Sequence, residues 1–149
     1  VIIEPEIVVS VATMGIPLAI EASRALGLDD YVILHKTPKI HLGETWSEPV
    51  YSITTDKPQR LRMDPARVAA VRGRRVAVVD DVISTGASLS SALRLVRRMD
   101  AEPVVIGTLM TEGGAWKAAL GEDAALVRTL GAMPLFHPDA DGGLVEDWG

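Results

Sequence analysis

The sequence predicts an α/β fold, in which a parallel sheet of about five strands is covered by helices on both faces. Runs rich in Val and Ile recur along the chain between amphipathic stretches, the alternation expected of βαβ units. The 149 residues are 48% hydrophobic, enough for one domain with a core. Two adjacent carboxylates, Asp80 and Asp81, directly follow an apolar run, where open α/β sheets bind their ligands.

Five apolar runs are expected to form the sheet. They are Ile7–Ala12, Tyr31–His35, Arg75–Val79, Pro103–Met110 and Leu126–Gly131. Each is short and rich in β-branched or other apolar residues, as buried strands are. Neither an internal repeat nor a linker divides the chain, so residues 1–149 are expected to form a single domain.

Helices are expected between these runs. The first extends from about Pro17 to Leu26, with Gly27 as its C-cap. Asp64 and Pro65 indicate the start of a second, short helix, since they suit the N-cap and first helical positions. A further short helix is expected near residues 115–120.

The best-defined helix begins near Gly86. Its apolar residues repeat every three or four positions, at Leu89, Leu93, Val96 and Met99. The opposite side carries Arg94, Arg97 and Arg98. This pattern predicts a helix with one buried face and one basic outer face.

Two segments lack helical periodicity. Residues 36–63 are polar, contain three prolines (Pro38, Pro49 and Pro58) and include β-like pieces at 49–54 and 59–63, which indicates a functional flap. After Pro134 the chain is acidic and rich in Gly and Pro. This tail, including Trp148, is predicted to be a mobile end.

Charge and composition exclude several classes of protein. With 15 Lys and Arg against 20 Asp and Glu, the net charge of -5 provides no basic surface for nucleic acid. The absence of Cys excludes disulfides and thiolate metal sites and is consistent with a cytoplasmic location. No apolar run approaches the roughly 18 residues needed to span a membrane, so no membrane association is expected.

The segment RVAVVDDVISTGASL, residues 75–89, carries the strongest chemical signal. Its strand delivers Asp80 and Asp81 to the carboxyl edge of the sheet, and small and hydroxyl residues at 85–88 then open a helix. A helix start of this kind offers free N–H groups and suits a phosphate monoester. The carboxylates suit the hydroxyls of an attached sugar and a Mg²⁺ ion.

A purely structural interpretation remains open at this point, because Asp before a helix can be an N-cap and STG is a common turn composition. The P-loop pattern GxxxxGK[ST] and the dinucleotide pattern GxGxxG are both absent, which disfavours those nucleotide-binding classes. His35, His41 and His137 lack the spacing of metal ligands.

The motif VVDDVISTGASL resembles the phosphoribosyl-pyrophosphate (PRPP) binding motif of type I phosphoribosyltransferases. The resemblance covers nearly the whole chain, because SVATMGIPLAIEASRALG is similar to the first strand, pyrophosphate loop and helix of the purine branch, and His35-Lys36 matches its basic pair. It implies a central parallel sheet with a hood and a mobile loop. Since Val1 lies just before a strand-like segment, we expect an N-terminal hood segment to be missing.

The resemblance also implies roles for particular residues. Asp80 and Asp81 would face the ribose hydroxyls as catalytic residues and hold Mg²⁺ through water and PRPP. The 5′-phosphate would be cradled by Ser84, Thr85, Gly86, Ala87 and Ser88. Pyrophosphate would be lined by Thr13, Met14, Gly15 and Lys36. The base would be framed by Met110, Thr111, Glu112 and Trp116, although Trp116 equally suits packing between helix and sheet.

Two positions depart from the family pattern. Ser84 stands where 6-oxopurine enzymes usually have an Asp, which disfavours hypoxanthine-guanine activity of that type. Met14 stands where relatives often have a basic residue, so neutralisation of pyrophosphate would depend on Mg²⁺, Lys36 and Lys39. The phosphate cradle itself is retained.

The expected reaction is the Mg²⁺-dependent transfer of phosphoribose from PRPP to a nitrogenous base, with a purine of the adenine or xanthine sort as acceptor. A flap at residues 36–63 would exclude water, and Glu44 or Glu48 could accept the proton or simply be solvated charges. Arg60 and Arg62 could touch phosphate or a subunit neighbour. The family habit implies a homodimer.

Two alternatives remain. The first is a non-catalytic PRPP-binding regulator of nucleotide metabolism, because the same motif occurs in regulators of this fold. The second is an orotate-type enzyme, in which Ser or Thr is common at the position of Ser84. A PRPP synthetase, which has two such domains, is excluded by the length of the chain.

Overall fold

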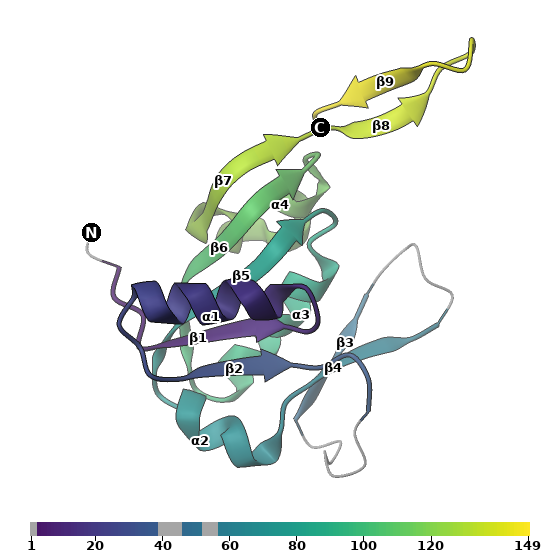
Figure 1. Ribbon diagram of the computed structural model, residues 1–149. Helices are drawn as coiled ribbons and strands as arrows, with labels where there is room; N and C mark the ends of the chain where they lie inside the picture. The colour runs from purple at the N-terminus through teal and green to yellow at the C-terminus, as the bar shows by residue number, and fades with distance from the viewer. Residues whose placement is uncertain (1–2, 39–45, 52–56) are drawn as a thin grey trace.

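The centre of the molecule is a five-stranded sheet. The computed structural model describes residues 3–38, 46–51 and 57–149. The strands lie in the order β2-β1-β5-β6-β7, and each runs parallel to its neighbours (Figure 1). They are β1 Ile7–Val11, β2 Tyr31–Leu34, β5 Arg75–Ile83, β6 Glu102–Glu112 and β7 Val127–Met133. The predicted fold class is confirmed.

Helices lie on both faces of this sheet. Figure 1 shows α1, Gly15–Ala25, in front of the sheet, with α3, Ala87–Arg98, and α4, Ala115–Leu120, behind it. The short α2, Val68–Val71, follows a 3₁₀ turn at Pro65–Arg67, and a second 3₁₀ turn occupies Gly121–Leu126. As predicted, the Asp64 carboxylate caps the first of these turns by accepting from the Ala66 N–H at 2.9 Å. In the part of the chain described, no helix is both long and apolar enough to cross a bilayer.

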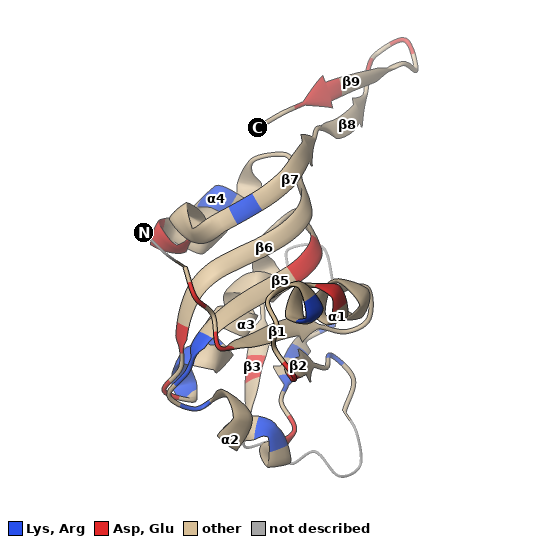
Figure 2. Ribbon diagram, turned by 60° about the vertical axis from the view of Figure 1, so that its left-hand side comes forward, with Lys and Arg blue, Asp and Glu red and all other residues tan. Residues whose placement is uncertain are grey.

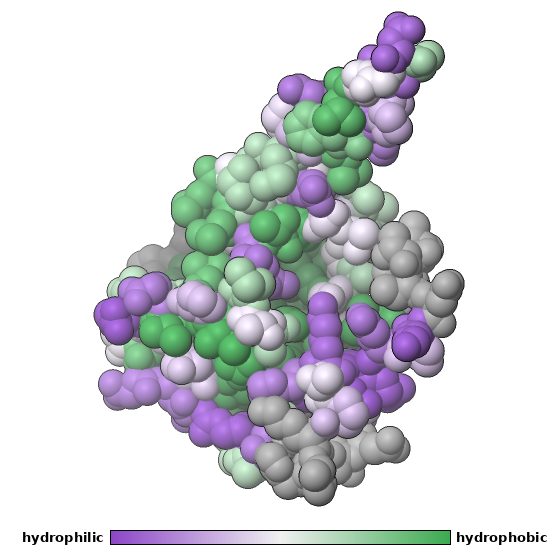
Figure 3. All heavy atoms as spheres, turned by 45° about the vertical axis from the view of Figure 1, so that its right-hand side comes forward, coloured by the Kyte–Doolittle hydropathy of each residue, from purple (hydrophilic) through white to green (hydrophobic). Residues whose placement is uncertain are grey.

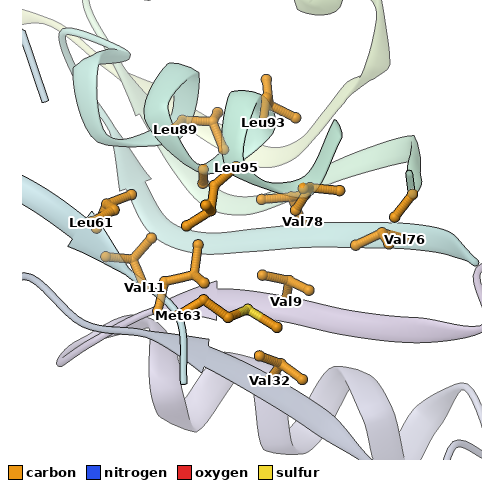
Figure 4. Close-up of a cluster of buried hydrophobic side chains, with 14 of the residues drawn as sticks. Val9, Val11, Val32, Leu61, Met63, Val76, Val78, Leu89, Leu93 and Leu95 are labelled. Carbon is orange, nitrogen blue, oxygen red and sulfur yellow. The ribbon is translucent and has the colours of Figure 1, made fainter. Parts of the chain in front are cut away.

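The main core lies between the sheet and α3. The four apolar positions predicted for this helix, Leu89, Leu93, Val96 and Met99, are all buried. Figure 4 shows Leu89, Leu93 and Leu95 of α3 in one cluster with Val78 of β5. Every residue of β1 is buried because the strand lies inside the sheet with neighbours on both sides. The helical periodicity therefore identified the correct face of α3.

Strand β5 is longer than predicted. It continues past Val79 to Ile83, and Asp80 pairs with Thr108 of β6. The polar side chains hid this extension, because a hydrophobic pattern stops where the carboxylates begin. Asp80 and Asp81 are thus held within a sheet strand and not on a loop.

Part of the segment predicted to be a flap is a packed hairpin. Strands β3, Ser47–Val50, and β4, Gln59–Arg62, pair antiparallel and lie against α3. Leu61 and Met63 are fully buried in the main core. This corrects the interpretation of residues 36–63 as one flap, and a closing role remains a prediction only for the rest of the segment. Glu44 and Lys39 lie outside the described residues.

The acidic tail is also structured, which corrects the prediction of a mobile end. Strands β8, Leu135–Pro138, and β9, Leu144–Asp147, form an antiparallel hairpin that projects from the sheet (Figure 1). At its tip the Asp139 carboxylate accepts from the N–H groups of Asp141 and Gly143. Figure 2 shows acidic residues along this hairpin, and Figure 3 shows apolar and polar side chains mixed on its surface.

Candidate functional site

The candidate site lies at the switch point of the sheet, between β1 and β5. From β1 the chain continues outward to β2, whereas from β5 it continues outward on the other side to β6 and β7. Neighbouring strands whose connections diverge leave a crevice at their carboxyl ends, where ligands bind in open α/β sheets. A cavity of about 290 Å³ lies there. Its lining residues are Val11, Ala12, Thr13, Met14, Lys36 and all of residues 80–89.

One wall of the cavity is the turn between β5 and α3. The predicted phosphate cradle, Ser84 to Ser88, forms this turn and lines the cavity; it is called the phosphate turn below. Gly86 caps α3 with a left-handed φ of 79°, and a Cβ there would lie only 3.1 Å from the Cβ of Ala119. The N-cap Gly86 has no side chain to cap α3, and the Ala87 N–H donates to Thr85 Oγ1 at 3.3 Å. The start of this helix lines the cavity and suits an anion.

The carboxylate pair forms the floor. The Asp81 N–H donates to Asp80 Oδ1 at 3.0 Å, and Thr108 Oγ1 donates to the Asp81 carbonyl at 2.9 Å. Burial, and after it the Asp81 side chain, raise the pKa of Asp80 to about 7 against the opposing effects of the Asp81 N–H and the Lys36 charge. Asp80 therefore lacks full compensation for its negative charge.

The opposite wall comes from the β1–α1 connection and the end of β2. Thr13, Met14 and Lys36 line the cavity, and Met14 is exposed. Gly15 is buried behind them as the first residue of α1. A Cβ on Gly15 would overlap Ser10 Oγ and lie 3.1 Å from Asp80 Oδ1, so this glycine permits α1 to approach the carboxylate. Three of the four residues predicted for pyrophosphate thus face the cavity, and the fourth supports it.

The residues predicted to frame the base lie outside this cavity. Met110, Thr111 and Glu112 are in the last part of β6, and Thr111 is buried. Trp116 is also buried; its Nε1 donates to the Gly113 carbonyl at 3.1 Å, and it packs beside Gly86. The structure therefore shows the packing role for Trp116, and contact of these residues with a base stays a prediction.

The charged residues Glu48, Arg60 and Arg62 of the hairpin do not line the cavity. Glu48, considered as a proton acceptor, instead accepts from Arg98 at 2.7 Å and from Arg94 at 3.4 Å. Arg60 donates to Ser47, and Arg62 donates to the Lys36 carbonyl at 2.9 Å. Sequence patterns missed these contacts because they join residues far apart in the chain. They also missed Val11, Val82, Ile83 and Leu89 as apolar lining of the cavity.

The donor set fits a particular kind of metal binding. Within the described ranges, no group of three or more His, Cys, Asp or Glu side chains could enclose a metal ion. Two adjacent carboxylates at the cavity suit a Mg²⁺ ion whose other ligands are water and phosphate oxygens of a substrate. The residues present therefore fit a hydrated Mg²⁺ ion that is shared between the carboxylates and the substrate. They do not fit a site in which the protein supplies every ligand.

A parallel sheet with a helix-opening turn and a carboxylate pair at its switch point is typical of α/β proteins whose cavity suits a sugar phosphate. Comparison with known families makes the class more specific. The family model for the phosphoribosyl transferase domain matches residues 3–128. The chain belongs to this family.

Individual relatives show how far the likeness extends. The chain is 29% identical over 107 residues to a xanthine phosphoribosyltransferase of Laribacter hongkongensis, covering 71% of this chain and 55% of the relative. It is 30% identical over 127 residues to the transcriptional regulator GfcR of Methanosarcina mazei, covering 85% of this chain and 55% of the relative. The chain thus spans about half the length of the curated relatives it matches.

A solved structure shows the same fold. The adenine phosphoribosyltransferase of Rhodothermus marinus superposes with a TM-score of 0.72 at 23% identity, covering 87% of this chain and 70% of that one. The common part includes most of the described chain and therefore supports the fold expected from the PRPP motif.

Proposed function

We propose that the protein transfers phosphoribose from PRPP to a nitrogenous base, giving a nucleoside 5′-monophosphate and pyrophosphate. The observation that carries this proposal is one cavity lined by three distinct features: an anion-binding turn at residues 84–88, the Asp80–Asp81 pair and the Lys36 side chain. PRPP has a 5′-phosphate, ribose hydroxyls and a pyrophosphate, so each feature has a chemical counterpart in one ligand.

The cavity geometry suggests how the substrate is held. The first-turn N–H groups of α3 and the hydroxyls of Ser84, Thr85 and Ser88 bind the 5′-phosphate. Asp80 and Asp81 accept hydrogen bonds from the ribose hydroxyls. Thr13 and Lys36 contact the pyrophosphate from the opposite wall. Mg²⁺, when bound beside the carboxylates, neutralises charge on the pyrophosphate leaving group.

The reaction is a displacement at C1 of the ribose. A ring nitrogen of the base forms a bond to C1 while the bond from C1 to the pyrophosphate oxygen breaks, and the ring nitrogen then loses its proton. Water would compete for the electron-poor C1, so the site must exclude it. Apolar Val11, Ile83 and Leu89 line the cavity beside the polar groups and limit the solvent within it.

The proposed acceptor is a purine of the adenine or xanthine sort. The xanthine phosphoribosyltransferase relative and the adenine phosphoribosyltransferase fold support this choice. Ser84 has no carboxylate with which to contact the purine as an acid or base, which disfavours activity of the hypoxanthine-guanine type. We also propose that the protein forms a homodimer and is located in the cytoplasm.

The test incubates the protein with PRPP, Mg²⁺ and one base at a time, including orotate, and follows the release of pyrophosphate. Adenine or xanthine is expected to support release, and a variant with Asp80→Asn and Asp81→Asn to abolish it. Release with orotate alone would assign an orotate-type enzyme. Failure of every base to react, together with no PRPP binding, would contradict the proposal.

A second candidate is a PRPP-binding regulator without catalysis. It is favoured by the match to the regulator GfcR, which covers more of this chain than the match to the xanthine enzyme does. The net charge of -5 opposes direct DNA binding by this chain. PRPP binding without turnover, combined with retention of DNA on a filter, would favour the regulator.

A further inference from the structure

Lys36 lies where the sheet no longer holds the chain. It follows β2, and residues 36–38 have no helix or strand structure. Its side chain is long and flexible, yet it lines the cavity on the side opposite the phosphate turn. A lysine on a loosely held backbone would lose conformational entropy each time it bound an anion. Something must therefore hold the main chain at this position.

Arg62 of β4 supplies that support through both its backbone and its side chain. The Arg62 N–H donates to the His35 carbonyl at 2.8 Å, and the His35 N–H donates to the Arg62 carbonyl at 2.9 Å. The Arg62 Nη1 then donates to the Lys36 carbonyl at 2.9 Å and to the Arg60 carbonyl at 3.2 Å. His35 and Lys36, which follow β2, are thus both hydrogen-bonded to Arg62 of the hairpin.

The hairpin is itself fixed to α3. Leu61 is fully buried, and the side chain of Glu48 is only 13% exposed between Arg94 and Arg98. Arg94 also donates to the Pro49 carbonyl at 2.9 Å, and the Ser91 hydroxyl donates to the same carbonyl. Because α3 begins at the phosphate turn, a continuous set of contacts leads from that turn through α3, Glu48 and β4 to Arg62.

We propose that Arg62 is a positioning residue for Lys36, holding the lysine backbone so that its ammonium group meets the pyrophosphate of PRPP. This inference rests on the proposed function. Arg62 does not line the cavity, and its Nη1 donates to the Lys36 and Arg60 carbonyls, so its position suits an action through Lys36. Arg62 would lower the entropic cost of PRPP binding and fix the distance from Lys36 to the phosphate turn on the other wall of the cavity.

The test measures binding of PRPP and of ribose 5-phosphate, each with Mg²⁺, by calorimetry. Ribose 5-phosphate lacks the pyrophosphate, so it should not depend on Lys36. Arg62→Gln is expected to weaken PRPP binding about tenfold and to change ribose 5-phosphate binding less than about twofold. In a Lys36→Ala background the same substitution is expected to have no further effect on PRPP, since coupled residues are not additive.

Arg60→Gln is the matched control. Arg60 lies on the same strand and loses the same charge, but its side chain bonds Ser47 and not Lys36. It should leave both affinities within about twofold of the parent. Arg62→Lys keeps a cationic donor near the Lys36 carbonyl and should retain most of the parent's PRPP affinity. If Arg62→Gln does not fold, the affinity of Arg62→Lys for the two ligands provides the test.

Several outcomes would overturn the inference. Equal weakening of both ligands by Arg62→Gln would show general disruption of the site, and an unchanged PRPP affinity would show that Lys36 needs no support. Additive losses in the Lys36→Ala background would show that Arg62 acts independently of Lys36. A parent protein that binds PRPP, with an Arg62→Gln variant that binds it equally well, would refute this role alone, whereas a parent that does not bind PRPP would refute the proposed function as well.

Discussion

Replacing Asp80 with Asn is expected to change how the stability of the protein depends on pH. Burial raises the pKa of Asp80 to about 7 in the folded chain, whereas in the unfolded chain the group titrates near its ordinary value of 3.8. Between these values the folded state keeps a proton that the unfolded state has released. The stabilisation is therefore complete below the unfolded pKa and is lost as pH rises through the folded pKa.

The size of the effect follows from the two pKa values. A shift of about three units corresponds to roughly 4 kcal/mol between the protonation states. Asn keeps a similar shape but never ionises. The free energy of unfolding of the variant relative to the parent should therefore rise by roughly 2–3 kcal/mol between about pH 5 and pH 8.

Urea unfolding followed by circular dichroism at several pH values, in Mg²⁺-free buffer, measures this difference. Asp141→Asn, at the exposed tip of the β8–β9 hairpin, is the matched control and should leave the pH dependence unchanged. A difference between Asp80→Asn and the parent that stays constant over this pH range would refute the reasoning. It would mean that the empty site holds Asp80 ionised despite its burial.

Three further results are expected. Gly15→Ala should lower the free energy of unfolding by roughly 1–3 kcal/mol in urea titrations, because the added methyl group overlaps Ser10 Oγ; an unchanged midpoint would contradict this packing. Glu48→Gln should destabilise the protein by roughly 1–3 kcal/mol in the same assay, because Arg94 and Arg98 lose their shared, largely buried carboxylate; a loss below about 0.3 kcal/mol would show that the hairpin is held without it. Millimolar PRPP with Mg²⁺ should raise the melting temperature measured by calorimetry, whereas absence of any shift would argue against a PRPP site.

The parts that sequence could predict depend on local patterns. The buried stripe of α3 follows from a helical repeat, and its four apolar positions are buried as expected. The phosphate turn and the carboxylate pair are contiguous in sequence at residues 80–88, so their meeting in one cavity needed only a strand followed by a helix. Lys36 and Thr13 came from the family resemblance, since nothing local indicates that β1 and β2 end beside β5.

The parts that sequence could not predict depend on distant contacts. Helical periodicity correctly placed Arg94 and Arg98 on an outer face, where their side chains are 41% and 47% exposed, but it did not reveal that Glu48 of the β3–β4 hairpin accepts from both. Those pairs are separated by 46 and 50 residues, so no short pattern reveals them. The β8–β9 hairpin was missed because its strands have four residues each and its acidic composition resembles that of a mobile tail.

Hydrogen exchange with and without PRPP and Mg²⁺ tests most directly the claim that PRPP binds in the switch-point cavity. The ligand is expected to slow exchange of the amides at residues 84–88 and 13–14, which form the two walls, and to leave the β8–β9 hairpin unchanged. Asp80→Asn combined with Asp81→Asn should greatly reduce this protection. Protection confined to residues that do not line the cavity, or unchanged exchange in both walls when PRPP is bound, would contradict the account.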